Sequence, residues 1–315
     1  MERLIIGTRG SRLAVWQAEY VARRLQAIEP SMDVSLKYFD TQGDRVQDRP
    51  IPQIGAKGLF TQELEEALRI GAVDLAVHSL KDLPTELSPQ FVIGAVPERA
   101  SVHDVLISRS GCTLDELPIG AAVGTSSLRR TAQLKSARPD LNILPLRGNV
   151  PARIEKALAG DGPYEAVVLA EAGLERLGLA GSITELLPTD VMLPAPAQGA
   201  LAVQGRADDR AVLALVARLD HDETRLEVEA ERAFLNRLDA GCRLPVAALA
   251  RWDGASLRLI SRVSSLDGTQ VITVESTRPL AGRAEATAFG QQLAAEAIQH
   301  GADRLLDAVR EGLTE

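Results

Sequence analysis

Lys81 and Asp82 follow a short apolar run, at a position where an α/β protein could bind a charged ligand. Residues 72–77 are almost all apolar, which favours a buried strand, and Pro84 prevents that strand from continuing. Ligands of open α/β sheets bind beyond the carboxyl ends of the strands, which is where Asp82 falls. The segment by itself also fits an ordinary solvated Lys-Asp turn, so the rest of the chain must decide between the two interpretations.

A turn with two arginines joins the first expected strand, residues 4–7, to a helix expected over residues 13–27. Residues 8–12 of this turn would present free N–H groups and the positive end of the helix dipole, both of which attract an anion. The alternative is that Ser11 serves only as a helix N-cap. The two arginines favour an anion site as much as the serine favours a simple cap.

Three further strand-to-helix turns follow along the chain. Residues 125–130 place threonine and serine before two arginines, Arg147 and Arg153 bracket the start of the next helix, and residues 171–176 end in an arginine. Arginine binds carboxylates in a bidentate manner, and these turns fall at equivalent strand ends. The turns together predict a cleft for a ligand with several negative charges.

Cys242 lies in a loop between an expected helix and an expected strand, beside Gly241 and Arg243. A neighbouring cation lowers the pKa of a thiol and makes it a nucleophile or an attachment point. An inert, buried side chain is the alternative for a lone cysteine. No His-Asn or His-Asp pair can be assigned near Cys242, so a papain-like hydrolase is poorly supported and a covalently tethered group fits better.

The composition excludes several classes of function. A net charge of −8 argues against a nucleic-acid partner. The first residues contain too few apolar side chains for a signal peptide, and no run approaches the roughly 20 apolar residues that span a bilayer. Two cysteines and four scattered histidines give neither a metal pattern nor a disulfide pattern. We therefore expect a cytoplasmic protein with no metal, no membrane partner and no nucleic acid.

The order of expected elements predicts an α/β fold with three domains. Alternating strands and helices favour largely parallel sheets, and Pro/Gly-rich crossings at residues 97–101 and 193–200 indicate two lobes joined by two hinge strands. The tail should contain helices and three antiparallel strands, separated by Asp-Gly hairpin signals at 253–254 and 267–268. The expected lobes comprise residues 1–98 with 199–217 and residues 99–198, and a small α+β domain comprises residues 218–315.

Residues 40–57 show no periodicity and contain several prolines and glycines. An irregular loop of this length inside a compact domain predicts a lid or binding loop, with a disordered linker as the alternative.

The chain resembles the porphobilinogen deaminases (hydroxymethylbilane synthases), essentially from end to end. Each motif is modest evidence alone, but the set in this order is highly specific. The motifs are Thr8-Arg9-Gly10-Ser11, Lys57-Gly58-Leu59-Phe60, Val77-His78-Ser79-Leu80-Lys81-Asp82, Gly124-Thr125-Ser126-Ser127-Leu128-Arg129-Arg130, Leu146-Arg147-Gly148-Asn149, Gln198-Gly199 and Gly241-Cys242.

The resemblance implies a fold and an activity. The family joins four porphobilinogen molecules head to tail onto a covalently bound primer, releases ammonia at each step, and hydrolyses off hydroxymethylbilane. The primer is a dipyrromethane cofactor, held by a thioether to a cysteine that matches Cys242. Two lobes like type II periplasmic binding proteins around a cleft, and a C-terminal α+β domain with a three-stranded antiparallel sheet, are the expected fold. The family expectation is a monomer with a small-molecule substrate.

The resemblance also implies roles for single residues. Asp82 matches the catalytic aspartate, which would stabilise the cation left by the loss of ammonia and support proton transfers. The residues that match cofactor-binding positions are Lys81, Ser79, Thr125, Ser127, Arg129, Arg130, Arg147, Gly148 and Asn149. Those that match substrate-binding positions are Arg9, Ser11, Gln17, Arg147, Arg153, Arg176 and Gln198. The matches to the mobile lid are Asp44, Lys57 and Phe60.

Three positions depart from the family pattern. Gln42 and Gln53 reduce the positive charge that members often carry in the lid, and Ala197 replaces a glycine that is common before Gln198-Gly199. The last change concerns the flexibility of the hinge. Two rival functions remain: a non-catalytic bilobal binding protein for a small polycarboxylate, which has no use for a Gly-Cys loop, and a Cys-dependent transferase, which would need an activating base near Cys242.

Overall fold

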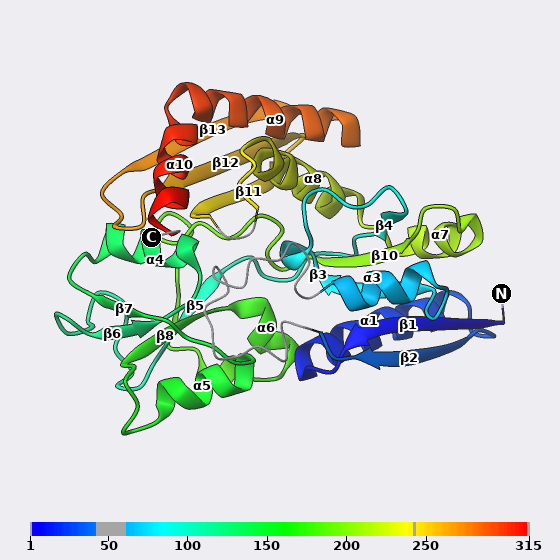
Figure 1. The fold of residues 1–315 in the computed structure, drawn as a ribbon, viewed down its shortest axis with the longest axis horizontal. Helices are drawn as coiled ribbons and strands as arrows, with labels where there is room; N and C mark the ends of the chain where they lie inside the picture. Colours follow the sequence, from blue (N-terminus) through cyan, green and yellow to red (C-terminus); the bar gives the residue numbers. More distant parts are fainter. Residues whose placement is uncertain (1, 42–60, 242–243, 314–315) are drawn as a thin grey trace. The chain divides into compact units, whose positions relative to one another are not determined.

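The computed structural model describes residues 2–41, 61–241 and 244–313 (Figure 1). These residues form two compact units. The first unit contains the described residues up to 100 together with residues 199–225. The second contains residues 101–198 and those from 226 onward. The chain therefore passes between the units at 100–101, at 198–199 and at 225–226, and the three-domain division made from the sequence stays a prediction.

A five-stranded mixed sheet in the order β2-β1-β3-β10-β4 forms the centre of the first unit. Three of its strands pair in parallel, and β10 runs antiparallel to both of its neighbours. The strands are β1 (Arg3–Arg9), β2 (Asp33–Phe39), β3 (Leu75–Ser79), β4 (Phe91–Ala95) and β10 (Leu201–Arg206), and the helices are α1 (Arg12–Ile28), α3 (Gln62–Arg69) and α7 (Arg210–Val216). The expected helix over 13–27 is thus confirmed.

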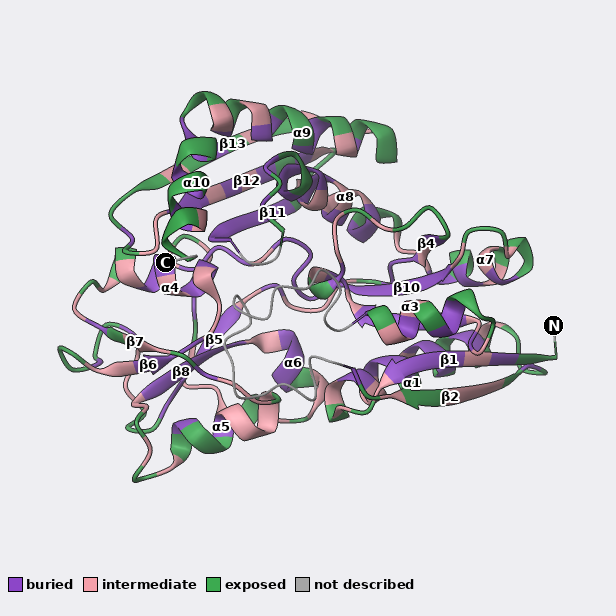
Figure 2. Ribbon diagram, viewed as in Figure 1, coloured by how far each residue is buried: buried purple, intermediate pink, exposed green. Residues whose placement is uncertain are grey.

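Helices cover the first sheet, and its strands β1, β3 and β10 are mostly buried. Val21 and Leu25 of α1 pack in one core with Leu4 and Ile6 of β1. On another face, Leu64 and Leu68 of α3 are fully buried. Figure 2 shows that β10 is buried along most of its length, whereas the edge strand β2 has only exposed and intermediate residues.

The second unit contains a five-stranded sheet with the order β7-β6-β8-β5-β9, in which β5 is antiparallel to both of its neighbours. Its strands are β5 (Asp104–Ser108), β6 (Ala122–Gly124), β7 (Asn142–Leu144), β8 (Ala166–Ala170) and β9 (Glu185–Leu186), and its helices are α4 (Leu128–Ala137), α5 (Val150–Leu158) and α6 (Glu171–Arg176).

In each five-stranded sheet four strands run in one direction and a single strand runs against them, so the expectation of largely parallel sheets holds for all strands but β10 and β5. A strand reached through a helical crossover runs parallel to its predecessor, and β1, β2 and β3 follow that rule. In contrast, β5 and β10 each follow a crossing from the other unit, so no crossover helix sets their direction. Each of them enters its sheet antiparallel to both neighbours.

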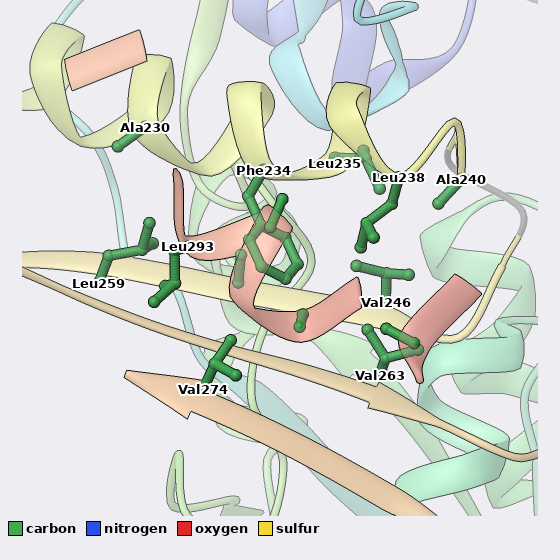
Figure 3. Packing of buried hydrophobic residues seen from close by; sticks show 14 of the residues in the cluster. Ala230, Phe234, Leu235, Leu238, Ala240, Val246, Leu259, Val263, Val274 and Leu293 are labelled. Atoms are coloured by element: carbon green, nitrogen blue, oxygen red, sulfur yellow. The ribbon is translucent and has the colours of Figure 1, made fainter. Parts of the chain in front are cut away.

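The C-terminal part of the second unit is a small α+β region with a three-stranded antiparallel sheet, β11-β12-β13. Figure 3 shows its core, in which Phe234 from α8 packs over Val246 and Val263 of the sheet. The elements are α8 (Asp222–Arg237), β11 (Val246–Asp253), β12 (Ser256–Ser264), β13 (Val271–Pro279), α9 (Arg283–Gln299) and α10 (Ala302–Gly312).

Both hairpin signals of this region are confirmed. Gly254 and Gly268 have φ angles of 59° and 74°, in the left-handed region that glycine enters without strain. The hairpin turn at Gly268 also packs against the backbone of Ser136 in α4, where a side chain would clash.

The fold class predicted from the sequence is therefore confirmed: two α/β lobes, each on its own sheet, and a small α+β region with three antiparallel strands. In the described part of the chain, no helix is both long enough and apolar enough to cross a membrane.

Candidate functional site

A small pocket of about 70 Å³ lies in the first unit, at the carboxyl ends of β1 and β3. It brings together five residues predicted from the sequence and places His78 among them. The pocket is lined by Arg9, Ser11, Leu13, Ala14, Gln17, Thr61, Val77, His78, Ser79 and Asp82. Pockets that enclose a whole ligand measure several hundred Å³, on the order of 300–1,000. This pocket can therefore hold only one part of a larger ligand.

The start of α1 brings two of these residues into place. Ser11 Oγ accepts a hydrogen bond from Ala14 N at 3.3 Å, so Ser11 is the N-cap of the helix while it also lines the pocket. Gln17 is buried on the face of α1 that meets β3, and its Nε2 donates to Ser79 Oγ at 2.9 Å. The cap and the pocket are thus two roles of one turn rather than alternatives.

Asp82 ends the short 3-10 turn η2 (Leu80–Asp82), which follows β3 directly. Two buried leucines hold this turn: Leu80 N donates to Ala200 O at 3.0 Å, and Leu83 N donates back to Leu80 O at 3.2 Å. The carboxylate of Asp82 is exposed between them and lines the pocket. Lys81 lies half-buried in the same turn. The backbone hydrogen bonds of these two buried leucines therefore hold the Lys-Asp turn in place, whereas a freely solvated turn would not need them.

A second cluster lies in the second unit, where two adjacent arginines of α4 share one aspartate. Asp104 is fully buried, with Arg129 Nη1 at 2.7 Å from Oδ2 and Arg130 Nη2 at 2.6 Å from Oδ1. Each arginine also donates to a carbonyl, Leu193 O for Arg129 and Val168 O for Arg130. Burial lowers the pKa of Arg129, while Asp104 opposes that change. Because guanidinium groups stay protonated, the cluster has a net charge of plus one.

Gln198 belongs to this cluster. Its side chain is buried, and Nε2 donates to Val102 O at 2.7 Å and to Asp104 Oδ1 at 3.1 Å. The structure thus places this predicted substrate contact on the aspartate that holds the two arginines. Ala197, the preceding residue, is fully buried with φ at 63°, and its N–H donates to Glu231 Oε2 at 2.5 Å.

The other predicted residues of the second unit lie at the starts of its helices. Ser127 caps α4 by accepting from Arg130 N at 3.4 Å, and Ser127 N donates to the hydroxyl of buried Thr125 at 3.2 Å. Asn149 caps α5, where Asn149 Oδ1 accepts from Ala152 N at 3.0 Å. The predicted strand-turn-helix units of this lobe therefore form.

Gly148 has φ at 119°, and its carbonyl accepts from Arg153 Nε at 2.8 Å, so the arginine closes the turn before α5. Arg147 is half-buried there, and burial lowers the pKa of its guanidinium. Arg176 ends α6 and is half-buried.

Four predicted site residues lie outside the described residues: Asp44, Lys57, Phe60 and Cys242. The described segment before Cys242 is held from the C-terminal helix, because Arg310 Nη2 donates to Leu238 O at 3.3 Å and to Asp239 O at 2.9 Å. Among the residues that the structure describes, no group of three or more His, Cys, Asp and Glu side chains is placed to hold a metal ion.

Reasoning from the sequence did not identify two residues of these clusters. Asp104 opens an apolar strand, and an acidic residue before a buried run was the only local sign of its role. His78 lies in the motif that contains Asp82, but its spacing indicates no function. Its ring Nε2 lies 3.0 Å from Oε1 of Gln204, a residue 126 positions further along the chain.

Comparison with known proteins gives one consistent result over both units. Residues 4–214 match the family model "Porphobilinogen deaminase, dipyromethane cofactor binding domain", and residues 225–299 match "Porphobilinogen deaminase, C-terminal domain". The chain is 46% identical over 305 residues to the porphobilinogen deaminase of Roseiflexus sp. (strain RS-1), covering 97% of this chain and 99% of that one. It is 48% identical to that of Desulforudis audaxviator, with 98% of each chain covered.

Proposed function

Because this chain belongs to the porphobilinogen deaminase family, we propose that the two residue clusters divide the work of its reaction. The chain is a transferase of tetrapyrrole synthesis that uses a dipyrromethane cofactor. Head-to-tail condensation of four porphobilinogen molecules, with loss of ammonia and final hydrolysis to hydroxymethylbilane, is the activity assigned to it. The observation that carries the proposal is the pocket of the first unit, where Asp82, Arg9 and Gln17 meet.

In the first unit, Asp82 acts on the substrate. Loss of ammonia from the aminomethyl group leaves a methylene-pyrrolenine cation, and a carboxylate fixed nearby stabilises that charge as it develops. The same carboxylate supports the proton transfers at the leaving amine and at the new ring junction. Arg9 binds a carboxylate of porphobilinogen, and Ser11 and Gln17 provide neutral polar groups around it.

In the second unit, the residues fit a cofactor that carries carboxylates. The Asp104 cluster retains one positive charge in a site almost closed to solvent, and a bound carboxylate would neutralise it. Within this unit, Arg129, Arg130 and Arg147 would hold the dipyrromethane carboxylates together with Thr125, Ser127, Gly148 and Asn149. Ser79 and Lys81 of the first unit also match cofactor-binding positions. Arg153, Arg176 and Gln198 would contact the substrate or the growing chain. The cofactor supplies the free pyrrole position to which new units are added.

Three further parts of the proposal concern residues and properties beyond the described geometry. Cys242 holds the cofactor through a thioether, and Asp44, Lys57 and Phe60 belong to the lid. We also propose that the protein acts as a monomer in the cytoplasm, with porphobilinogen as its partner.

The role of Asp82 is tested by turnover of porphobilinogen in Asp82→Asn, with Glu86→Gln as the control. Both side chains are exposed carboxylates, four residues apart. We expect Asp82→Asn to fold and to carry the cofactor, but to lose nearly all turnover, whereas Glu86→Gln keeps it. Near-normal turnover in Asp82→Asn would refute the role given to this carboxylate.

A further inference from the structure

A chain of three side chains from separate elements leads into the pocket of the first unit. Glu65 of α3 accepts from Gln204 Nε2 at 3.0 Å, and Gln204 Oε1 lies 3.0 Å from His78 Nε2. Gln204 on β10 is fully buried, and His78 on β3 is nearly so. His78 is the member that lines the pocket, together with Asp82 and Arg9.

Glu65, at the far end of this series of hydrogen-bonded side chains, determines which nitrogen of His78 carries a proton. The Glu65 carboxylate can only accept hydrogen bonds, so it must face the NH₂ group of Gln204. The carbonyl oxygen of Gln204 then faces His78, and it too can only accept. His78 Nε2 must therefore be the donor, and in a neutral imidazole Nδ1 is left with a lone pair.

The surroundings also keep the imidazole neutral. Burial lowers the pKa of His78 to about 4, the hydrogen bond to Gln204 opposes this change, and the charge of Arg9 adds to it. Among the described residues that line the pocket, Asp82 is the one carboxylate, and the carboxylate of Glu65 is separated from the ring by Gln204. Within the described residues, no hydrogen bond to His78 Nδ1 is made.

We propose that His78 Nδ1 is a hydrogen-bond acceptor for an N–H group of porphobilinogen, held in one tautomer by Gln204 and Glu65; this inference rests on the proposed function. Porphobilinogen has two kinds of N–H donor, the pyrrole N–H and the aminomethyl ammonium. Asp82 provides a charged acceptor for one of them, and His78 provides a neutral acceptor for the other.

The same geometry argues against His78 as a proton carrier. A histidine that relays protons must take a proton on one nitrogen and release one from the other, but an amide oxygen such as that of Gln204 does not pass a proton on. A low proton affinity also makes His78 a weak general base near neutral pH. His78 is thus a binding group whose lone pair stays available throughout the reaction.

The tautomer is tested directly by ¹⁵N NMR of the holoenzyme with labelled histidine. We expect Nε2 of His78 to be protonated and Nδ1 to be unprotonated from pH 6 to pH 8. Addition of porphobilinogen to Asp82→Asn, which should bind without turnover, is expected to shift the Nδ1 resonance of His78 upfield. A protonated Nδ1 in the free holoenzyme, or an Nδ1 resonance that porphobilinogen leaves unchanged, would overturn the proposal.

Kinetics separate binding by His78 from a merely structural role. His78→Leu removes the acceptor and should lower kcat/KM for porphobilinogen about tenfold or more, the equivalent of one lost hydrogen bond. His78→Asn keeps an amide acceptor and should recover part of this loss. Gln204→Leu removes the acceptor that holds His78 in one tautomer. The NMR spectrum of this variant should show both tautomers, and its kcat/KM should be lower than that of the wild type.

The matched controls are His300→Leu and His300→Asn, at a histidine of the second unit outside the pocket. The wild type is first shown to turn over porphobilinogen. If the two His78 variants then have the same kcat/KM as the two His300 variants, this inference alone is refuted. A wild type that carries cofactor but does not consume porphobilinogen would instead refute the proposed function.

Discussion

Nη2 of Arg130 lies 2.6 Å from Oδ1 of Asp104, and both side chains are shielded from solvent. The other carboxylate oxygen of Asp104, Oδ2, pairs with Arg129, so the three side chains form a buried group of three charges. Such groups cost free energy to desolvate, and they hold together only while each charge has its partner. Asp104 therefore governs where the two arginines, the proposed cofactor ligands, point.

Replacing Asp104 by asparagine should be strongly destabilising, because it leaves two buried guanidinium groups without a counter-charge. We expect Asp104→Asn to lower the free energy of unfolding by about 3–5 kcal/mol. In the control Glu275→Gln, which removes an ion pair of similar length between exposed side chains, the loss should stay below about 1 kcal/mol. Urea unfolding of both variants measures the difference, and equal losses would contradict the importance given to Asp104.

The buried state of His78 predicts an acid-sensitive fold. The pKa of His78 is lowered from 6.5 to about 4 by burial, so the folded chain binds fewer protons than the unfolded chain. The stability that follows is complete above about pH 6.5 and is lost as the pH falls towards 4. Between pH 7.5 and pH 5 this one group should cost about 2 kcal/mol.

Urea unfolding of wild type and His78→Asn at these two pH values tests the assignment. The variant should lose less stability on acidification than the wild type does, by about the 2 kcal/mol that the titration of His78 contributes. Identical losses in the two proteins would show that His78 is not the responsible group.

Ser261 on β12 is an uncompensated polar group in the C-terminal core. Its side chain is fully buried, and Ser261 Oγ has no hydrogen-bond partner among the described residues. Ser261→Ala should therefore raise the free energy of unfolding by about 1 kcal/mol, since it removes a desolvated hydroxyl. Ser276→Ala, at a partly exposed position of β13, should change it by less than about 0.5 kcal/mol. A lower midpoint of unfolding for Ser261→Ala would contradict this account.

Ala197 adopts a backbone conformation that favours glycine. Its φ angle of 63° costs an alanine about 1 kcal/mol, and glycine would remove this strain at the expense of greater freedom in the unfolded chain. We expect Ala197→Gly to be at least as stable as the wild type. Ala200→Gly, at a buried alanine without a positive φ, should lose about 1 kcal/mol. If Ala197→Gly also lost about 1 kcal/mol in its free energy of unfolding, the backbone at Ala197 would not be strained.

Local patterns predicted the parts of the fold and site that depend on neighbouring residues. The pocket could be anticipated in part because Arg9 and Asp82 stand at the ends of strands that periodicity identifies, whereas Ser79 and Gln17 were expected only from the family resemblance. The hairpins could be anticipated because Gly254 and Gly268 occupy turns that need a positive φ.

Features that depend on distant parts of the chain could not be predicted in this way. The direction of β10 follows from a crossing between units, which leaves no trace in its apolar pattern. The roles of Asp104 and His78 depend on partners 26 and 126 residues away, Arg130 and Gln204. A charged residue at the head of a strand and a histidine within a motif have no spacing that reveals such partners.

The central claim, that this chain carries a dipyrromethane primer on Cys242, is tested most directly by the intact denatured mass of the purified protein. We expect the wild type and Cys112→Ser to exceed the mass of the bare chain by two linked pyrrole units, and Cys242→Ser to lack this excess. If the purified wild type lacks the excess mass, by this account it is an apoenzyme, and incubation with porphobilinogen should then add the mass of two linked pyrrole units. Excess mass on Cys242→Ser would contradict attachment at this residue, and a wild type that never gains the mass would contradict the claim and favour a non-catalytic binding protein.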